Sequence, residues 1–402
     1  MQKTRGFIDL ADTLIIDRFH EFGGKHCETA SLKKLLDFQG LPISEEMLLG
    51  LGGGVGFIYW HMRKMPSPFI GTRYSKGENF LVTICKRLGA RATVIETSSP
   101  KKGYDELKAI LKTGDAAICY GDMAYLPYFA LPEIAHFGGH AFVVFGLDEK
   151  NGEVYVSDRA SKPVKVSLED LQKARGSRFP PFPPKHKLLK IEYPHKIAHL
   201  EKGIVESVRD CYTNMLKPPI RNIGLTGMQK WADTVMKWPQ QFKGSSFCSC
   251  LFNAFLYIEI GGTGGSAFRT MYAKFLEEAS IILDNPDLRN VAQMFRESAQ
   301  AWSQIALSAL PNSWSTLKRI RELTIEKDAH FLKQEPNALK KMKHVNSEMN
   351  NLMEKAAVEL HTDDVEPLLS NLQQNILACH KLESQAFHEL SRIINNRGKR
   401  NV

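Results

Sequence analysis

Three residues in the first half of the chain have the side chains and the order of a cysteine-based nucleophile. Cys27 follows one Gly-Gly pair, His140 follows a second, and Asp158 comes soon after His140. A thiol attacks carbonyl carbon efficiently only as the thiolate, which a neighbouring base produces. These residues would support covalent acyl chemistry, with Cys27 as nucleophile, His140 as proton acceptor and donor, and Asp158 orienting the imidazole.

Each of these residues also has an ordinary structural interpretation. Alone, Cys27 could be a small buried hydrophobe, His140 a hydrogen-bonded strand residue and Asp158 a turn residue. The two Gly-Gly pairs and the hairpin predicted between His140 and Asp158 favour chemistry for the set. His136, on the same loop as His140, is the main rival base, and His26 beside Cys27 is expected to be a structural neighbour.

The first element that must position the site is a helix predicted over residues 29–39. Three leucines lie on one face of this segment, and Gly40 is a typical stop. Cys27 is therefore expected at or just before the first turn. The partial positive charge of a helix N-terminus favours a thiolate there.

The second element is a hairpin of strands predicted over residues 141–147 and 154–157, with Asn151-Gly152 as the turn signal. Because side chains alternate along a strand, a two-residue Asn-Gly turn would place His140 and Asp158 on opposite faces. A three-residue loop, with Gly152 in the left-handed conformation, would place them on the same face. The catalytic interpretation requires that loop or an equivalent bulge.

The remaining pattern predicts an α+β domain followed by an all-helical domain. The first domain, residues 1–195, ends after a Pro-rich stretch at 179–184. The second, residues 200–402, has its clearest helix at 266–283. Further helices are predicted at 79–88 and 104–111, and further strands at 92–96, 116–120 and 188–193. A long antiparallel helical pair is predicted from 339–360 and 365–394.

Several segments resemble a known family. Residues 26–32, 50–60 and 138–144 look like the N-terminal domain of the butirosin-biosynthesis acyltransferase family. Residues 200 to about 310, with the glycine-rich run from Gly261, look like the helical domain that usually follows it. The resemblance implies a papain-like fold, akin to bacteriocin-leader peptidases, with catalytic roles for Cys27, His140 and Asp158. The named member of the family moves an aminoacyl group from a carrier-protein thioester to an aminoglycoside amine.

One departure from the wider papain-like pattern affects the chemistry. Enzymes of that fold usually place a Gln several residues before the Cys, and residues 19–24 contain none. The oxyanion donors would then be the Cys27 N–H and another group, such as N–H groups of the Gly23-Gly24 turn. This favours transfer from an activated thioester over hydrolysis of a peptide.

Other residues are candidates for substrate binding, each with a structural alternative. Asp122 could bind an amine or cap its turn. The glycine loop at 52–54 could bring backbone close to an acyl group, or it could be a tight turn. The loop at 261–265 with Arg269 could cradle a phosphate, or it could be a flexible link. The full set of candidates is Gly24, Gly53, Gly54, Tyr59, Trp60, Asp122, Gly264, Gly265 and Arg269.

Composition bounds the partners. The net charge of +9 permits an acidic partner, but the basic residues are spread along the chain, which argues against a nucleic acid. Seven scattered cysteines have no metal-site spacing, and no apolar run reaches membrane-spanning length. Aspartates in the first twenty residues argue against a secretion signal, so a reduced cytoplasmic enzyme is expected.

The sequence therefore predicts a cysteine-dependent acyltransferase that uses no bound cofactor. Its donor would be a thioester on phosphopantetheine, either on an acyl carrier protein or on coenzyme A, and its acceptor a small amine. A peptidase or amidase with the same residues, and a non-catalytic binding protein on the same fold, are the alternatives. Homo-oligomers are possible through the C-terminal helices.

Overall fold

The computed structural model describes residues 8–10, 13–62, 65–74, 79–132, 134–362 and 364–400. The chain divides into two compact units, each made of several segments. The first, here called the sheet unit, consists of Met1–Glu45, Leu88–Ala198 and Lys327–Asn346. The second, here called the helical unit, consists of Glu46–Arg87, His199–Glu326 and Ser347–Val402.

The described residues of the sheet unit form one eight-stranded antiparallel sheet. The strands are β1 (Ile8–Leu10), β2 (Thr13–Ile15), β5 (Arg91–Ile95), β6 (Ala117–Gly121), β7 (His140–Asp148), β8 (Glu153–Ser157), β9 (Val164–Ser167) and β10 (Leu188–Glu192). The longest, β7, pairs with β2, β6 and β8 and is buried throughout. Its run of β-branched and aromatic residues suits a strand covered on both faces.

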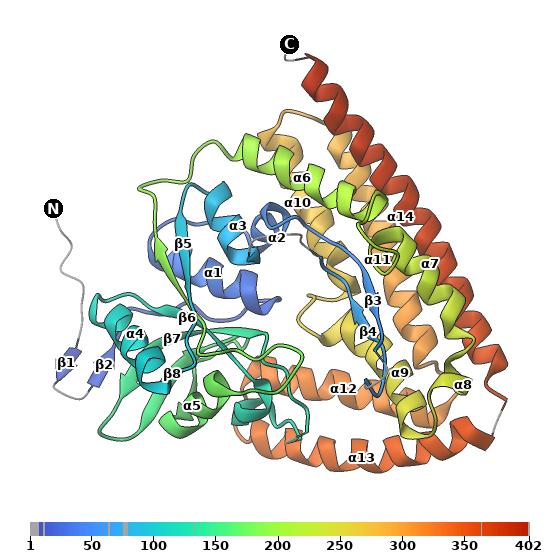
Figure 1. The fold of residues 1–402 in the computed structure, drawn as a ribbon, viewed down its shortest axis with the longest axis horizontal. Helices are drawn as coiled ribbons and strands as arrows, with labels where there is room; N and C mark the ends of the chain where they lie inside the picture. Colours follow the sequence, from blue (N-terminus) through green and yellow to red (C-terminus); the bar gives the residue numbers. More distant parts are fainter. Residues whose placement is uncertain are drawn as a thin grey trace. The chain divides into compact units, whose positions relative to one another are not determined.

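Three helices accompany this sheet (Figure 1). They are α1 (Cys27–Phe38), α4 (Pro100–Lys112) and α5 (Leu168–Gly176). Helix α1 packs on β7, and α4 contacts β2, β6 and β7. The predicted strands 92–96, 116–120, 141–147, 154–157 and 188–193 are confirmed within a residue at each end. Strand β9 and helix α5 were not predicted.

The helical unit consists mainly of helices, with one small hairpin. Its elements are α2 (Glu45–Leu51), β3 (Ile58–Trp60), β4 (Phe69–Gly71), α3 (Phe80–Arg87), α6 (Leu200–Leu216), α7 (Gly224–Val235), α8 (Trp238–Gln241), α9 (Ser245–Phe255), α10 (Arg269–Ile282), α11 (Asp287–Ala309) and α14 (Glu366–Arg400). Helices α12 (Ser315–Lys333) and α13 (Ala338–Thr362) contribute to both units. An α+β protein with a helical C-terminal region is therefore confirmed.

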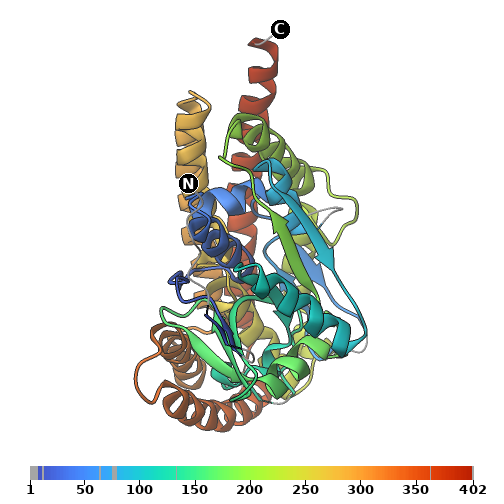
Figure 2. The same ribbon diagram turned by 90° about the vertical axis from the view of Figure 1, so that its left-hand side faces the viewer.

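The long C-terminal helices have different partners from those predicted. Helix α14, drawn in red, packs along α11, α7 and α6 (Figure 1, Figure 2). Helix α13 is joined to α12 instead, by the Arg319–Glu348 ion pair at 2.8 Å. The apolar face of α14 is thus buried by three earlier helices. The predicted antiparallel pairing of this helix with α13 is wrong.

Candidate active site

Cys27 is the first residue of helix α1. His26 precedes it as N-cap, in extended conformation, and its Nδ1 accepts a hydrogen bond from the Thr29 N–H. The Cys27 side chain is only half-buried, whereas the other six cysteines of the chain are buried. The prediction that Cys27 lies at the helix N-terminus is confirmed, and this end of the helix dipole favours a negative charge.

Glu45 holds the segment that leads into α1 through hydrogen bonds to its carboxylate. Its carboxylate accepts hydrogen bonds from the His26 N–H at 2.8 Å, the Lys25 N–H at 3.0 Å and the Thr29 hydroxyl at 3.0 Å. These donors include groups that have no carbonyl partner in the first turn of a helix. Glu45 was not predicted as a site residue, because no local pattern in the sequence relates it to the Cys27 segment.

The β7–β8 hairpin places His140 and Asp158 on the same face. The pairs Asp148–Glu153 and Gly146–Tyr155 leave a four-residue loop, which alone would put the two side chains on opposite faces. The register shifts between Val144 and Gly146, so a bulge adds one residue to β7 and restores a common face. The common face that the catalytic interpretation requires is therefore produced by the bulge in β7 and not by a three-residue loop.

His140 and Asp158 form a buried pair. The His140 Nε2 lies 2.7 Å from Asp158 Oδ2, and both side chains are almost fully buried. Tyr128 also donates its hydroxyl to Oδ2 at 2.9 Å, and the Arg159 N–H donates to Oδ1 at 2.7 Å. Each carboxylate oxygen of Asp158 therefore has a hydrogen-bond donor, as a buried charge requires.

The electrostatics of this pair favour an imidazolium. Burial disfavours the charged ring, but the charge and hydrogen bond of Asp158, together with the Cys27 thiol, raise the pKa of His140 to about 9. Burial also opposes ionisation of Asp158, yet His140 and Lys34 lower the pKa of that carboxyl to about 2. With Nε2 on Asp158, the His140 nitrogen left for the Cys27 thiol is Nδ1.

Aromatic rings enclose the imidazole. Phe129 contacts the His140 ring edge-on, with centroids 5.1 Å apart, and Phe142 lies 6.1 Å away. Phe331 packs on Tyr128 and Phe129 from the end of α12. These rings limit the motion of His140 and exclude water from its bond with Asp158.

Lys34 is a second charged residue in this region. It lies on α1, is only 4% exposed, and donates a hydrogen bond from Nζ to the Asp158 backbone carbonyl. Burial lowers the pKa of Lys34 to about 8, while Asp158 and Glu45 act in the opposite direction. Lys34 was not predicted as a site residue from the sequence.

Two regions of the chain match known families. Residues 26–159 match the family model described as butirosin biosynthesis protein H, N-terminal. Residues 169–334 match a domain of unknown function, DUF4872. No curated protein matches the chain. The resemblance to this family that was expected from the sequence is confirmed over residues 26–159, and this matched region includes Cys27, His140 and Asp158.

The rival histidines of this family region have other partners. His136 Nδ1 lies 2.8 Å from Asp122 Oδ2, and its ring stacks on Phe179 at 3.4 Å. His26 caps α1, as expected of a structural neighbour. Neither histidine shares the Asp158 carboxylate, so His140 is the better candidate for the base.

Asp122 is a turn residue with internal partners. Its fully buried carboxylate accepts hydrogen bonds from the Ala124 N–H, the Phe137 N–H, the Ser177 hydroxyl and His136. No lone pair is turned to solvent, so Asp122 is not placed to bind a substrate amine. The turn-capping alternative describes it correctly.

The Gly23-Gly24 turn packs closely on α1. A Cβ on Gly24, whose φ is +135°, would lie 2.2 Å from the Ala30 Cβ. The Gly23 N–H donates to the Ala160 carbonyl at 2.8 Å. Gly23 is therefore committed to the fold, and Gly24 is the residue of this turn that is left as an oxyanion-donor candidate.

The predicted binding residues at 53–60 belong to the helical unit. Tyr59 is 3% exposed and accepts a hydrogen bond from Trp238 Nε1 at 3.0 Å. A Cβ on Gly54 would lie 2.3 Å from the Tyr272 ring, whereas Gly53 has open space around it. Trp60 is 38% exposed. The tight-turn alternative fits Gly54 and Tyr59, which are packing residues.

Arg269 is a structural residue of the helical unit. It is fully buried and donates to Glu383 at 2.6 and 2.9 Å, and to the carbonyls of Gly56, Thr72 and Ala267. Glu383 also accepts from Ser298 and Trp302. Since its donors are used internally, Arg269 cannot serve the anion site that the sequence suggested.

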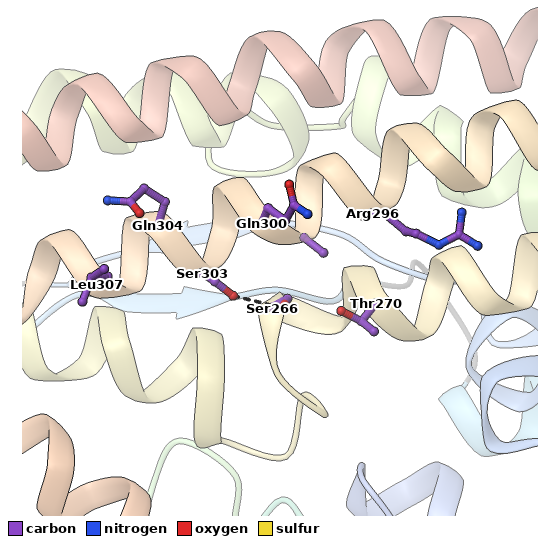
Figure 3. A pocket seen from close by; sticks show the side chains of 8 residues that line it. Ser266, Thr270, Arg296, Gln300, Ser303, Gln304 and Leu307 are labelled. Atoms are coloured by element: carbon purple, nitrogen blue, oxygen red, sulfur yellow. Dashed lines mark hydrogen bonds between the residues drawn. The ribbon is translucent and has the colours of Figure 1, made fainter.

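The loop of Gly264 and Gly265 instead leads to a shallow pocket of about 460 Å³ (Figure 3). Ser266 lines this pocket and has a φ of +52°. Its hydroxyl lies 3.1 Å from the hydroxyl of Ser303. Arg296, which also lines the pocket, is paired with Glu277. The other lining residues are Thr270, Ala299, Gln300, Gln304 and Leu307.

The described residues show neither a candidate metal centre nor a candidate membrane span. They contain no group of three or more His, Cys, Asp or Glu side chains that could hold a metal ion. They also contain no helix with the length and apolar character needed to cross a membrane.

Proposed function

We propose that the chain is a cysteine-dependent acyltransferase in which Cys27 carries the acyl group. The observation that carries the proposal is the bonding of the His140 imidazole. Its Nε2 is held by the buried Asp158, which leaves the other ring nitrogen for the Cys27 thiol, a neighbour that helps to raise the pKa of His140. A raised imidazole pKa and a helix N-terminus both favour an imidazolium–thiolate pair.

The reaction would take place in two steps, acylation of Cys27 and transfer of the acyl group to the amine. In the first, the Cys27 thiolate attacks the thioester carbonyl, and the departing thiolate of the donor takes a proton from His140. In the second, an amine attacks the acyl-Cys27 carbonyl, His140 accepts its proton, and the Cys27 thiolate departs. Asp158 stays ionised in both steps and holds the ring in its working tautomer.

The developing oxyanion needs N–H donors. The Cys27 N–H, at the first position of α1, has no carbonyl one turn earlier in the helix with which to bond. Together with the Gly24 N–H it would form a pair of donors at the reacting carbon. A thioester, whose carbonyl is already activated, suits this minimal arrangement.

The likeness to the butirosin biosynthesis protein H N-terminal family supports a biosynthetic role on a papain-like fold. A donor with phosphopantetheine, on coenzyme A or on an acidic carrier protein, suits a chain with a net charge of +9. The acceptor would be a small amine.

Mass spectrometry of the intact protein tests the proposal. Wild type and Cys27→Ala are each mixed with a panel of acyl-pantetheine thioesters. We expect an acyl adduct on the wild type alone, which added amines discharge faster than water does. The six buried cysteines are poor competitors, because burial raises the pKa of thiols such as Cys211, to about 11.

Each other outcome rejects the transferase in a distinct way. Rapid conversion of the donor to free acid, unchanged by amines, would make the chain a hydrolase of the peptidase or amidase type. An identical adduct on Cys27→Ala would place the chemistry elsewhere. No adduct from any donor, with an unreactive Cys27, would leave a binding protein.

A further inference from the structure

A buried lysine lies on the same face of α1 as the nucleophile. Lys34 follows Cys27 by seven residues, which is two helical turns or about 10 Å along the axis. Helical side chains slant toward the N-terminus, so the long stem of Lys34 extends back toward the turn that holds Cys27. Its neighbours on this face include the buried Ala30 and Ser31.

The ammonium group meets the other half of the site. Its Nζ donates to the Asp158 backbone carbonyl. The charged or titratable groups that act on it are the carboxylates of Asp158 and Glu45, the Arg159 guanidinium and the Cys27 thiol. Lys34 is thus a direct link between the helix of Cys27 and the residue that orients His140.

Stability alone does not account for this lysine. Burying an ammonium costs several kcal/mol, and an apolar side chain of similar length often replaces a buried ion at no loss of stability. A methionine would fill the same space. The side chain that is present instead places a charge and a hydrogen-bond donor at the backbone of Asp158.

We propose that Lys34 is a positioning residue, which fixes the Asp158 backbone against α1 and so holds the Asp158–His140 pair opposite Cys27. The inference rests on the proposed pairing of Cys27 with His140. The carboxylate of Asp158 is held to its own following N–H at 2.7 Å, so its orientation depends on its backbone. The positive charge of Lys34 also favours the ionised form of Asp158.

The test is the rate of Cys27 alkylation by iodoacetamide from pH 5 to pH 10, followed by mass spectrometry of the Cys27 peptide. Lys34→Met removes the charge and the donor but keeps the volume. Lys34→Gln keeps a donor and removes the charge. Lys33→Met is the matched control, because Lys33 is half-exposed on the same helix and pairs with Asp37.

We expect Lys34→Met to alkylate about tenfold more slowly than wild type at pH 7, with its profile displaced upward by about one pH unit. Lys34→Gln should lie between the two, and Lys33→Met should match the wild type. If Lys34→Met does not fold, the Lys34→Gln profile decides alone. A folded Lys34 variant with the wild-type rate and profile would overturn the inference.

The same data separate this inference from the proposed function. His140→Ala is measured in parallel. If it leaves the wild-type profile unchanged, then Cys27 is not paired with His140 and the proposed function fails. If His140→Ala slows alkylation and Lys34→Met does not, only the role of Lys34 is refuted.

Discussion

Replacement of Asp158 by Asn removes the charge that holds His140 in its imidazolium form while keeping the shape of the side chain. Asn retains an oxygen to accept hydrogen bonds from His140 and Tyr128. What changes is the electrostatic balance, because burial disfavours the charged ring and Asp158 is the main opposing influence. The pKa of His140 should therefore fall from its present value of about 9.

The size of the effect follows from that pKa. The rise from an ordinary value of 6.5 to about 9 corresponds to about 3 kcal/mol of preference for the imidazolium. Cys27 supplies part of it, so Asp158 accounts for somewhat less. We expect Asp158→Asn to slow Cys27 alkylation at pH 7 roughly 30- to 100-fold.

The direction with pH is also fixed. In the wild type the imidazolium persists as pH rises until it is lost near pH 9, so alkylation should already be fast at neutral pH. In Asp158→Asn, fast alkylation should require alkaline pH, where the thiol ionises without help. The assay is the iodoacetamide pH–rate profile, with Asp148→Asn at the opposite end of the same hairpin as control. A wild-type rate at pH 7 in folded Asp158→Asn would refute the reasoning.

Two further predictions concern stability, measured by urea denaturation. Tyr128→Phe removes the second donor to the Asp158 carboxylate and should lower the free energy of unfolding by about 1.5–3 kcal/mol; a change below about 0.5 kcal/mol would contradict this role. Glu383→Gln leaves the buried Arg269 without a counter-charge and should cost about 3–5 kcal/mol. Glu389→Gln on the same helix, which removes a more exposed ion pair with Arg392, should cost about 1 kcal/mol or less, and equal losses would argue against a buried-charge effect.

The parts of the site that the sequence could predict are those set by local signals. Leucines at helical spacing and the stop at Gly40 indicated the helix, and α1 begins only two residues before the predicted start at Thr29. The shift arises at His26, whose side chain accepts from the Thr29 N–H and so caps the helix earlier. Runs of β-branched and aromatic residues located β7 and β8 in the same way.

The parts that could not be predicted are contacts between distant residues. Tyr128 reaches Asp158 across thirty positions, and Lys34 reaches it across 124. In the sequence, Lys34 is one of two adjacent lysines on an amphipathic helix, a pattern typical of a solvated face. Its burial depends on the position of Asp158, which helical periodicity does not encode.

The glycine-rich segments, for which ligand binding and structural packing were both left open, could not be assigned from the sequence for a related reason. A glycine run is compatible with close approach of a ligand or of another side chain, and composition does not distinguish them. Gly50 lies against the ring of Phe275, and Gly54 lies against the ring of Tyr272. Phe275 and Tyr272 are both residues of α10. Residues 46–87 accordingly belong to the helical unit, although the sequence placed them inside a domain of residues 1–195.

The hairpin shows most directly what a sequence can and cannot decide about this site. Every turn considered for Asn151-Gly152 is locally acceptable, yet the turns give opposite answers about whether His140 and Asp158 share a face. The four-residue loop by itself would place the two side chains on opposite faces, and the one additional residue in β7 brings them to the same face. The energy of that bulge depends on strands β2 and β8 on either side of β7, where Gly146 leaves room beside Ile15 and Tyr155. The pairing of His140 with Asp158, which the proposed activation of the thiol requires, therefore depends on packing across three strands. The sequence shows that the two side chains must share a face, but it does not determine whether they do.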